Sequence, residues 1–442
     1  MKISVIGAAL SGIAAAELAH RKGHDVFVSE AKSAEAASDA HARLGQHAIA
    51  CEFGGHTDRV YEADLIVVSP GVPPSHAVRV EAERRGIELI GELEYASRQL
   101  TNPIIAITGT NGKTTTTALT AYILQQSGRD AVAAGNIGTP LSALVDAITP
   151  QTVIVAECSS YQLDTITSFR PHVSMILNIT PDHLSYHGTF SQYVESKWKI
   201  ASNQQANDIV ILNADDPAVA PAASAVRSSV RFFSTTREVD GAFIRGGEIV
   251  LRDQQHTEEI LMSLRRLGLP GVHNAANSMA ATLAARAFEV RNENIRDSLM
   301  SFSGVEHRLE NVRIHKGARF VNDSKATNVN ATWYALSSYD RPIVWIAGGR
   351  GDSNNYAELD GLVAANVKSI VCIGEEAEAI FNHWCTTKRC VKAETMEDAI
   401  RIASEMALAD DVVLFSPACK SFDMFANYEE RGRAFKRLVA AL

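Results

Sequence analysis

The chain has 442 residues, of which 46% are hydrophobic and 21% charged, the composition of a globular protein with several domains. The net charge of −9 speaks against a nucleic-acid backbone as the main partner, because phosphate contacts need clustered Lys and Arg. The six cysteines lack metal-ligand spacing, which indicates reduced thiols in a cytosol. Neither a signal peptide nor an apolar run of about 18–20 residues is found, so we expect a cytoplasmic protein without a membrane partner.

Short apolar runs alternate with helical patterns along the chain, which predicts a parallel α/β architecture. Composition breaks divide it into domains at residues 1–98, 99–294 and 295–442. The first domain has expected strands at 3–6, 26–29 and 65–69. The second has strands at 104–108, 153–157, 173–179 and 209–213, a small β excursion over 234–259 and a helix at 274–287. The third has strands at 319–322, 343–347, 369–373 and 412–416.

Residues 104–116, IIAITGTNGKTTT, combine a buried strand, a glycine-rich turn and the start of a helix. Backbone N–H groups of such a turn can face an anion, and the helix N-terminus adds a favourable dipole. Lys113 is then placed to reach the β- and γ-phosphates of a nucleotide, and Thr114 to bind Mg²⁺. The spacing is shorter than that of the usual GxxxxGK[ST] motif, and the alternative is an ordinary glycine turn that caps a helix.

A second glycine turn, from Gly7 to Gly12, follows the first strand but has Ala9 where a dinucleotide fold has its middle glycine. Three interpretations remain open. The turn could hold a dinucleotide with Glu30 on a ribose, or a nucleotide-sugar diphosphate with Glu30 at the nucleoside. It could also be a tight turn without a ligand.

The central domain also carries a carboxylate, an imidazole and a lysine that fit a metal site. Glu157 ends a predicted strand, His183 follows the next strand, and Lys197 lies one helical pattern further on. Taken singly, each has a structural explanation, as a cap or a surface side chain. Together with a phosphate loop they favour metal-assisted phosphoryl transfer.

Several segments together resemble the Mur ligase family, and the resemblance runs nearly end to end. The matching segments are ITGTNGKTTTT from 107, GNIG from 135, AECSSYQL from 156, NITPDH from 178, HNAAN from 273, EHR from 306, NDSKATN from 322 and SPAC from 416. The resemblance implies an N-terminal Rossmann-like domain, a central P-loop ATPase-type parallel sheet and a C-terminal Rossmann-like domain.

The resemblance also implies an activity. ATP would phosphorylate the carboxylate of UDP-N-acetylmuramoyl-L-alanine, and the amine of D-glutamate would attack the acyl phosphate, with two Mg²⁺ ions present. NDSKATN and SPAC indicate D-glutamate as the amino acid. The implied enzyme is a monomer whose domains close around its substrates.

Site residues are implied by the same resemblance. Thr114 and Glu157 would hold one Mg²⁺, and His183 and a carbamylated Lys197 the other, with Lys113 the fourth catalytic residue beside Glu157, His183 and Lys197. The residues expected to bind ATP are Gly109, Thr110, Asn111, Gly112, Lys113, Thr114, Thr115, Asn274, Asn277, Arg308 and Asp323. The UDP-substrate would contact Ser11, Glu30, Ser69, Asn136 and Ser159. The amino acid would contact Lys325, Thr327, Lys420, Ser421 and Phe422.

The chain departs from the family pattern in two places. Asp352 stands about where the family has a cation for a glutamate carboxylate, and Lys420 stands where a small residue is usual. Our hypothesis is that Lys420 or Arg350 replaces the missing cation, since a dianionic amino acid beside an unpaired Asp352 would be repelled. The alternative is that Asp352 points to solvent.

Three competing functions are considered. An NAD-dependent oxidoreductase would explain two Rossmann-like blocks but leaves the Lys113 loop and NDSKATN unused. A regulatory module that hydrolyses ATP without making a bond is the second. The third is the same ligase chemistry with L-glutamate or D-aspartate.

Overall fold

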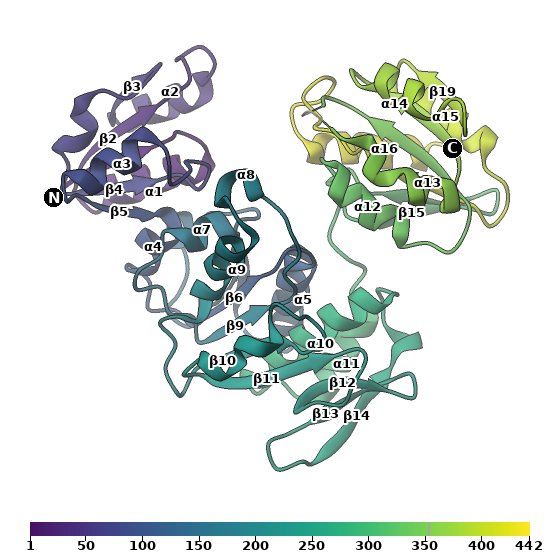
Figure 1. Cartoon of the computed structure of the whole chain (residues 1–442), viewed down its shortest axis with the longest axis horizontal. Helices are drawn as coiled ribbons and strands as arrows, with labels where there is room; N and C mark the ends of the chain where they lie inside the picture. Colours follow the sequence, from purple (N-terminus) through teal and green to yellow (C-terminus); the bar gives the residue numbers. More distant parts are fainter. Residues whose placement is uncertain (352–353) are drawn as a thin grey trace. The chain divides into compact units, whose positions relative to one another are not determined.

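The protein, described here by a computed structural model over residues 1–351 and 354–442, is an α/β protein built on three sheets. It divides into two compact units, Met1–Phe302 and Ser303–Leu442. The first unit contains two of the sheets, and the second contains the third (Figure 1). The α/β class predicted from the sequence is confirmed.

The N-terminal sheet has five parallel strands in the order β3-β2-β1-β4-β5. Its strands are β1 (Lys2–Ile6), β2 (Asp25–Glu30), β3 (Ala50–Phe53), β4 (Leu65–Val68) and β5 (Glu88–Gly91). The helices of this region are α1 (Leu10–Arg21), α2 (Ser38–Gln46), α3 (Ala77–Arg84) and α4 (Glu92–Ser97). The strand order reverses between β1 and β4, and such a reversal creates a crevice at the carboxyl ends of the strands.

The central sheet has nine strands in the order β14-β13-β12-β11-β10-β9-β6-β8-β7. The parallel strands are β6 (Ile104–Thr108), β7 (Ala131–Gly135), β8 (Val153–Glu157), β9 (Val173–Ile176), β10 (Ile209–Asn213), β11 (Ser229–Ser234) and β12 (Gly241–Arg245). The antiparallel extension adds β13 (Glu248–Arg252) and β14 (Glu258–Ser263), so the predicted β excursion is confirmed.

Helices connect the central strands and pack on them. They are α5 (Lys113–Gln126), α6 (Leu141–Leu144), α7 (Ser160–Asp164), α8 (Leu184–His187), α9 (Phe190–Trp198), α10 (Val272–Ala287) and α11 (Asn292–Ser301). α5 packs against α10 and α11 and also contacts β7 and β8. Because every residue of β6 and β8 is buried, these strands form the middle of a covered sheet and fix the position of the loops at their carboxyl ends.

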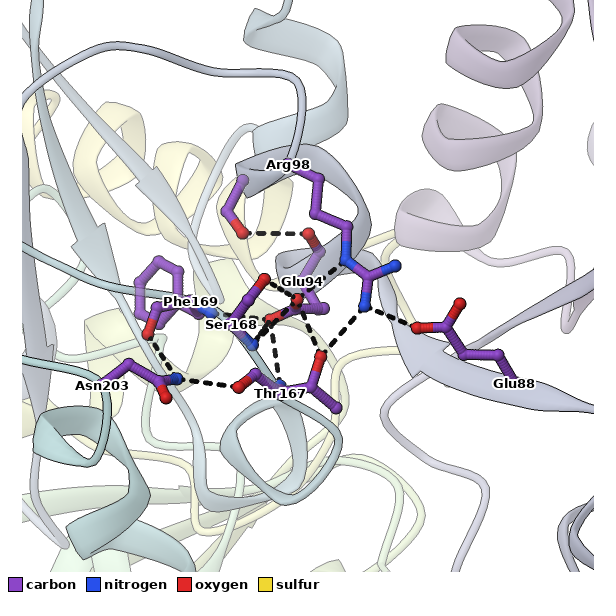
Figure 2. Close-up of polar contacts among 8 residues, drawn as sticks. Glu88, Glu94, Arg98, Thr167, Ser168, Phe169 and Asn203 are labelled. Carbon is purple, nitrogen blue, oxygen red and sulfur yellow. Dashed lines mark hydrogen bonds and ion pairs between the residues drawn. The ribbon is translucent and has the colours of Figure 1, made fainter.

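The N-terminal and central sheets share one hydrophobic core, which includes Leu93 and Ala96 of α4 together with Leu141 and Leu144 of α6. A buried carboxylate also connects the helix α4 to the central region through hydrogen bonds (Figure 2). Glu94 of α4 accepts hydrogen bonds from the backbone N–H groups of residues 167–169, which lie just after α7. The first two sheets therefore belong to one compact unit.

The third sheet has six strands in the order β15-β16-β20-β17-β18-β19, antiparallel only between β15 and β16. Its strands are β15 (Glu310–His315), β16 (Ala318–Asn322), β17 (Ile343–Gly348), β18 (Val367–Ile373), β19 (Arg389–Ala393) and β20 (Val412–Phe415). Its helices are α12 (Val329–Ser337), α13 (Asp360–Asn366), α14 (Ala377–Trp384), α15 (Met396–Met406) and α16 (Tyr428–Ala440). Two hydrophobic clusters occupy its two faces, one around Trp345 and one around Phe415.

Within the described part of the chain, no helix combines the length and the apolar character that crossing a membrane requires. The six cysteines are all free thiols.

Candidate active site

The glycine-rich loop predicted to bind phosphate lies between β6 and α5 at the carboxyl edge of the central sheet. Lys113 opens α5, and its Nζ atom donates to the carbonyl oxygens of Gly109 and Thr110, each at 2.9 Å. Gly112 has φ +82°, and a Cβ there would lie 2.5 Å from Oδ1 of Asn277. A glycine is therefore required, and the loop is packed against Asn277 of α10.

A second lysine reaches the same loop. Lys197 of α9 is 1% exposed, and its Nζ atom donates to the carbonyl oxygen of Gly109 at 2.8 Å. Lys113 and Lys197 thus share one acceptor. Burial, and after it the charge of Lys113, lowers the pKa of Lys197 well below its usual value, so a neutral amine is favoured.

Tyr193, which the sequence analysis did not single out, supports both the loop and Lys197. Its ring lies 4.6 Å from Nζ of Lys197, and its hydroxyl is 3.1 Å from Oγ1 of Thr110. Its signal in the sequence is weak, because an aromatic residue four positions before a lysine on a helix is ordinarily a core residue.

Glu157 ends β8 and faces the loop after β7. Its Oε1 atom accepts from Nδ2 of Asn136 at 2.9 Å, and its carbonyl oxygen accepts from the backbone N–H of Asn136 at 2.8 Å. A Cβ on Gly135 would lie 2.3 Å from that carbonyl oxygen, so the close approach needs glycine. The buried Oε2 atom of Glu157 has no hydrogen-bond partner among the residues that the structure describes. A buried carboxylate oxygen without a donor fits a site for a cation.

His183 is the residue before α8, in a left-handed conformation with φ +53°, and its side chain is 46% exposed. Its ring centroid lies 5.0 Å from that of Tyr161. Burial lowers the pKa of His183, and the charges of Lys113 and Lys197 lower it further, against the opposing charge of Asp182. The neutral imidazole that results is the form that binds a metal ion. Within residues 1–351 and 354–442, no group of three or more His, Cys, Asp or Glu side chains forms a complete metal site.

The residues predicted for the UDP-substrate lie at two places in the first unit. Glu30 ends β2, and its carboxylate accepts from the backbone N–H groups of Ala8 at 2.6 Å and Lys32 at 2.9 Å. Ser69 donates to the carbonyl oxygen of Gly7 at 3.4 Å, so Glu30 and Ser69 both contact the glycine turn that contains Ser11.

Ser159 lies elsewhere, as the N-cap of α7, two residues after Glu157. Its hydroxyl takes part in a capping box with Gln162.

The remaining residues predicted for ATP in the first unit lie on α5 and α10. Thr114 and Thr115 are buried in the first turn of α5. Asn274 lies in the first turn of α10, where its Nδ2 atom donates to the carbonyl oxygen of Pro270 at 2.8 Å.

In the second unit, Asp323 is buried at the end of β16. It accepts from Oγ of Ser416 at 2.8 Å and from the backbone N–H of Leu309 at 3.1 Å. Burial raises the pKa of Asp323 to about 7, although the hydrogen bond from Ser416 and the charge of Arg308 oppose the rise. The predicted residues Arg308 and Asp323 are thus close together.

The residues predicted for the amino acid lie after β16 and after β20. Nζ of Lys325 lies 5.8 Å from the ring centroid of Tyr428, a residue that the sequence analysis missed. The backbone N–H of Thr327 donates to the carbonyl oxygen of Lys325 at 2.9 Å. Ser421 is buried and Phe422 is 59% exposed.

Lys420 pairs with Arg350 through two backbone hydrogen bonds of 2.9 Å each. The Arg350 guanidinium forms a two-point ion pair with Glu375, at 3.0 and 2.7 Å. Asp352 lies outside the described residues.

A glycine-rich loop beside a buried carboxylate and two convergent lysines is an arrangement that fits phosphoryl transfer from a nucleotide. Three family models match the chain: the MurD N-terminal domain over residues 2–78, the Mur ligase middle domain over 107–285 and the Mur ligase glutamate ligase domain over 307–419. The chain belongs to the Mur ligase family, whose members are ATP-dependent ligases that form amide bonds.

Relatives match along the full length. The UDP-N-acetylmuramoylalanine–D-glutamate ligase of Salinibacter ruber is 47% identical over 454 residues, which cover 100% of this chain and 98% of that one. The enzyme of the same name from Acidobacterium capsulatum is 44% identical over 444 residues, covering 100% and 96%.

Among solved structures, UDP-N-acetylmuramate–alanine ligase MurC of Thermotoga maritima matches with TM-score 0.58 and 20% identity, covering 100% of both chains. FolC of E. coli in complex with DHPP and ADP matches with TM-score 0.59 and 17% identity, covering 79% and 92%. At these identities the structures show a shared fold.

Proposed function

We propose that this enzyme joins D-glutamate to UDP-N-acetylmuramoyl-L-alanine, with ATP as the phosphoryl donor, as a step of peptidoglycan synthesis. The observation that carries the proposal is the 47% identity, along the whole chain, to a relative named for that reaction. The site agrees with it, because Lys113 and Lys197 place two amines at the carbonyl oxygen of Gly109, where phosphate groups would meet a carboxylate. Its nucleotide substrates would place the enzyme in the cytoplasm.

The reaction proceeds in two steps. The carboxylate of the L-alanine attacks the γ-phosphorus of ATP, giving an acyl phosphate and ADP. The amine of glutamate then attacks the acyl carbon, phosphate leaves with the C–O bond electrons, and the amine gives up a proton. The first step is needed because a carboxylate has no good leaving group. Lys113 would screen the repulsion between the carboxylate and the γ-phosphate.

The residues around Glu157 fit Mg²⁺, because the unpartnered Oε2 atom and the Thr114 hydroxyl are oxygen donors of the kind that Mg²⁺ prefers. His183 and Lys197 would hold a second ion. Mg²⁺ would supply positive charge to the transferring phosphoryl group. Asn136, bonded to Oε1 of Glu157, would keep that carboxylate oriented.

Lys197 fits this second site only if its amine becomes an oxygen ligand. We therefore assign Lys197 as a carbamate. The nitrogen of the neutral amine attacks the carbon atom of CO₂, an N–C bond forms, and one proton is released. The burial of Lys197 and the charge of Lys113, which donates to the same carbonyl oxygen, both favour the neutral amine. Lys197→Ala is expected to be nearly inactive, with partial recovery when a short carboxylic acid is added. An alanine variant with full activity would remove Lys197 from the metal site.

Lys420 is proposed to bind a carboxylate of the incoming glutamate. Arg350 is engaged with Glu375, and the backbone bridge fixes Lys420 beside Ser421. Lys420→Ala is expected to raise KM for glutamate with little change in kcat. The matched control is Lys316→Asn. Lys316 is an exposed cation in a left-handed conformation, which Asn tolerates. An unchanged KM in Lys420→Ala would exclude the compensation.

The decisive experiment measures phosphate release by the purified protein with ATP, Mg²⁺ and UDP-N-acetylmuramoyl-L-alanine. D-Glu, L-Glu, D-Asp and L-Lys are supplied separately. Release only with D-Glu supports the proposal, whereas release with another amino acid keeps the ligase and changes its specificity. Release without any amino acid would favour an ATP-hydrolysing module.

A further inference from the structure

Two histidines meet above the carboxyl edge of the N-terminal sheet, and the functions assigned so far do not use them. His56 lies after β3 and His76 after β4, yet their ring centroids lie only 5.7 Å apart. In the strand order β3-β2-β1-β4-β5, two strands separate β3 from β4. The two loops therefore converge across the ends of β2 and β1, where the glycine turn and Glu30 lie.

The hydrogen bonds around His56 fix which of its ring nitrogens carries the proton. Oγ of Ser29 lies 2.6 Å from Oε1 of Glu52 and 2.7 Å from Nδ1 of His56. Hydrogen bonds from Thr57 and Ser29 outweigh burial and lower the pKa of Glu52, so the carboxylate is ionised and can only accept. Oγ of Ser29 also lies 3.3 Å from the carbonyl oxygen of Gly55, which like the carboxylate can only accept. The single proton of Ser29 therefore goes to the shorter of these two contacts, Glu52, and Nδ1 of His56 must donate to Ser29.

The other nitrogen of His56 is then an acceptor. Burial lowers the pKa of His56, and His76 lowers it further, while Glu52 and Glu30 oppose the shift. A neutral imidazole with its proton on Nδ1 has a lone pair on Nε2. Glu30, which accepts from the backbone N–H of Ala8 in the glycine turn, is thus close enough to influence the pKa of His56.

His76 has the opposite arrangement. It is the N-cap of α3, and its Nδ1 atom accepts from the backbone N–H of Val78 at 3.3 Å. An accepting Nδ1 places the proton on Nε2, which is then a donor. The pair, with ring centroids 5.7 Å apart, therefore offers one acceptor nitrogen and one donor nitrogen.

We propose that this histidine pair determines the specificity for uracil, with His56 accepting from N3–H and His76 donating to O4. The inference rests on the proposed function, which supplies a UDP-linked substrate to this crevice. Cytosine has an acceptor at N3 and an amino donor at position 4. Its N3 would therefore face the acceptor of His56, and its amino group would face the donor of His76. A site whose polar groups are left unpaired rejects an analogue strongly.

The test compares binding of UDP and CDP to the full-length protein by calorimetry at neutral pH. The wild type is expected to bind UDP and to bind CDP far more weakly. His56→Ala should weaken UDP about tenfold, the order expected for one lost hydrogen bond, and leave CDP nearly unchanged. Ser29→Ala should also lower the preference for UDP over CDP, but by less than His56→Ala. The imidazole of His56 remains in this variant, but its tautomer is no longer fixed.

His56→Phe keeps an aromatic ring against His76 without an acceptor, and it covers the case in which the alanine variant fails to fold. His20→Gln, an exposed histidine at the end of α1, is the control and should leave both affinities unchanged. An equal loss of UDP and CDP in both His56 variants, or no loss in either, would overturn the proposal. Absence of UDP binding by the wild type would instead overturn the proposed nucleotide substrate and this inference with it.

Discussion

Among the buried ionisable side chains of the first unit, Glu94 and Lys197 have opposite surroundings. Glu94 has no exposed side-chain surface, and Lys197 is 1% exposed. Glu94 is surrounded by donors (Figure 2), whereas Lys197 shares the carbonyl oxygen of Gly109 with a second lysine. The donors to Glu94 are the side chains of Arg98, Thr167 and Ser168 and the backbone N–H groups of Thr167, Ser168 and Phe169.

The two pKa shifts are caused by these surroundings. Burial opposes the charge of Glu94, but hydrogen bonds from Ser168, Arg98, Thr167 and Phe169 outweigh it and lower its pKa to about 2. Burial lowers the pKa of Lys197 and Lys113 lowers it further, so there the neutral form is favoured. A buried charge with a full set of partners stabilises a fold, and one without them indicates chemistry. The difference between the two regions can be tested by substitution.

The largest expected effect is on activity at Lys197. Lys197→Met removes the amine and keeps an unbranched side chain of similar length, so activity should fall by about 10³-fold or more. The melting temperature should stay the same or rise, because a buried amine beside a second lysine no longer has to be accommodated. Ligase assays and thermal unfolding measure the two effects. The control is Lys199→Met, a partly exposed lysine nearby on the chain.

A marked loss of stability in Lys197→Met, with activity retained, would contradict the distinction. It would make Lys197 a structural residue of the same kind as Glu94.

The next effect is on stability at Glu94. Glu94→Ala leaves the N–H groups of residues 167–169 buried without their acceptor and should lower the free energy of unfolding by about 3 kcal/mol. Denaturant unfolding measures the loss, and activity per folded molecule at low temperature should be retained. Glu88→Gln, at the half-exposed carboxylate that also binds Arg98, is the matched control and should cost far less.

Much of the fold could be predicted from the sequence because the middle strands of each sheet are continuous apolar runs. Ile104–Thr108 and Val412–Phe415 are entirely buried and were predicted almost to the residue. The strands that were missed lie mostly at sheet edges, as β3, β15 and β19 do. Edge strands face solvent on one side and mix polar with apolar residues, so their pattern differs little from that of a loop.

The residues of the candidate site likewise divide into those that could be predicted from the sequence and those that could not. The phosphate loop and Glu157 are recognisable because glycines and a strand-end carboxylate have local sequence signals. Tyr193 has only a weak local signal, and Tyr428 and the relay from Glu52 through Ser29 to His56 have none, because each depends on contacts between distant segments. That Lys197 shares a carbonyl oxygen with Lys113 is likewise visible only in three dimensions.

A smaller effect is expected from pH. The lowered pKa of Glu94 means that the folded state holds this proton less tightly than the unfolded state. Its contribution to stability should be complete above the unfolded value of about 4.3 and be lost as the pH falls toward about 2. The stability difference between wild type and Glu94→Gln, measured by urea unfolding, should therefore be constant at neutral pH and narrow below about 4. A difference independent of pH would show that folding does not shift the pKa of Glu94, and a difference that shrinks as the pH rises would show that the fold holds Glu94 neutral.

The smallest expected effect separates the two kinds of donor around Glu94. Arg98 is 30% exposed, and it binds Glu94 at 2.9 Å and Glu88 at 2.7 Å. Arg98→Met keeps the apolar stem and removes the charge, and because water can replace part of the lost hydrogen bond the cost should be only about 1 kcal/mol. Unfolding of the single and double variants with Glu94→Gln would measure the coupling between the two side chains. A cost as large as that of Glu94→Ala would mean that the charge of Arg98, rather than the three backbone N–H groups, keeps Glu94 ionised.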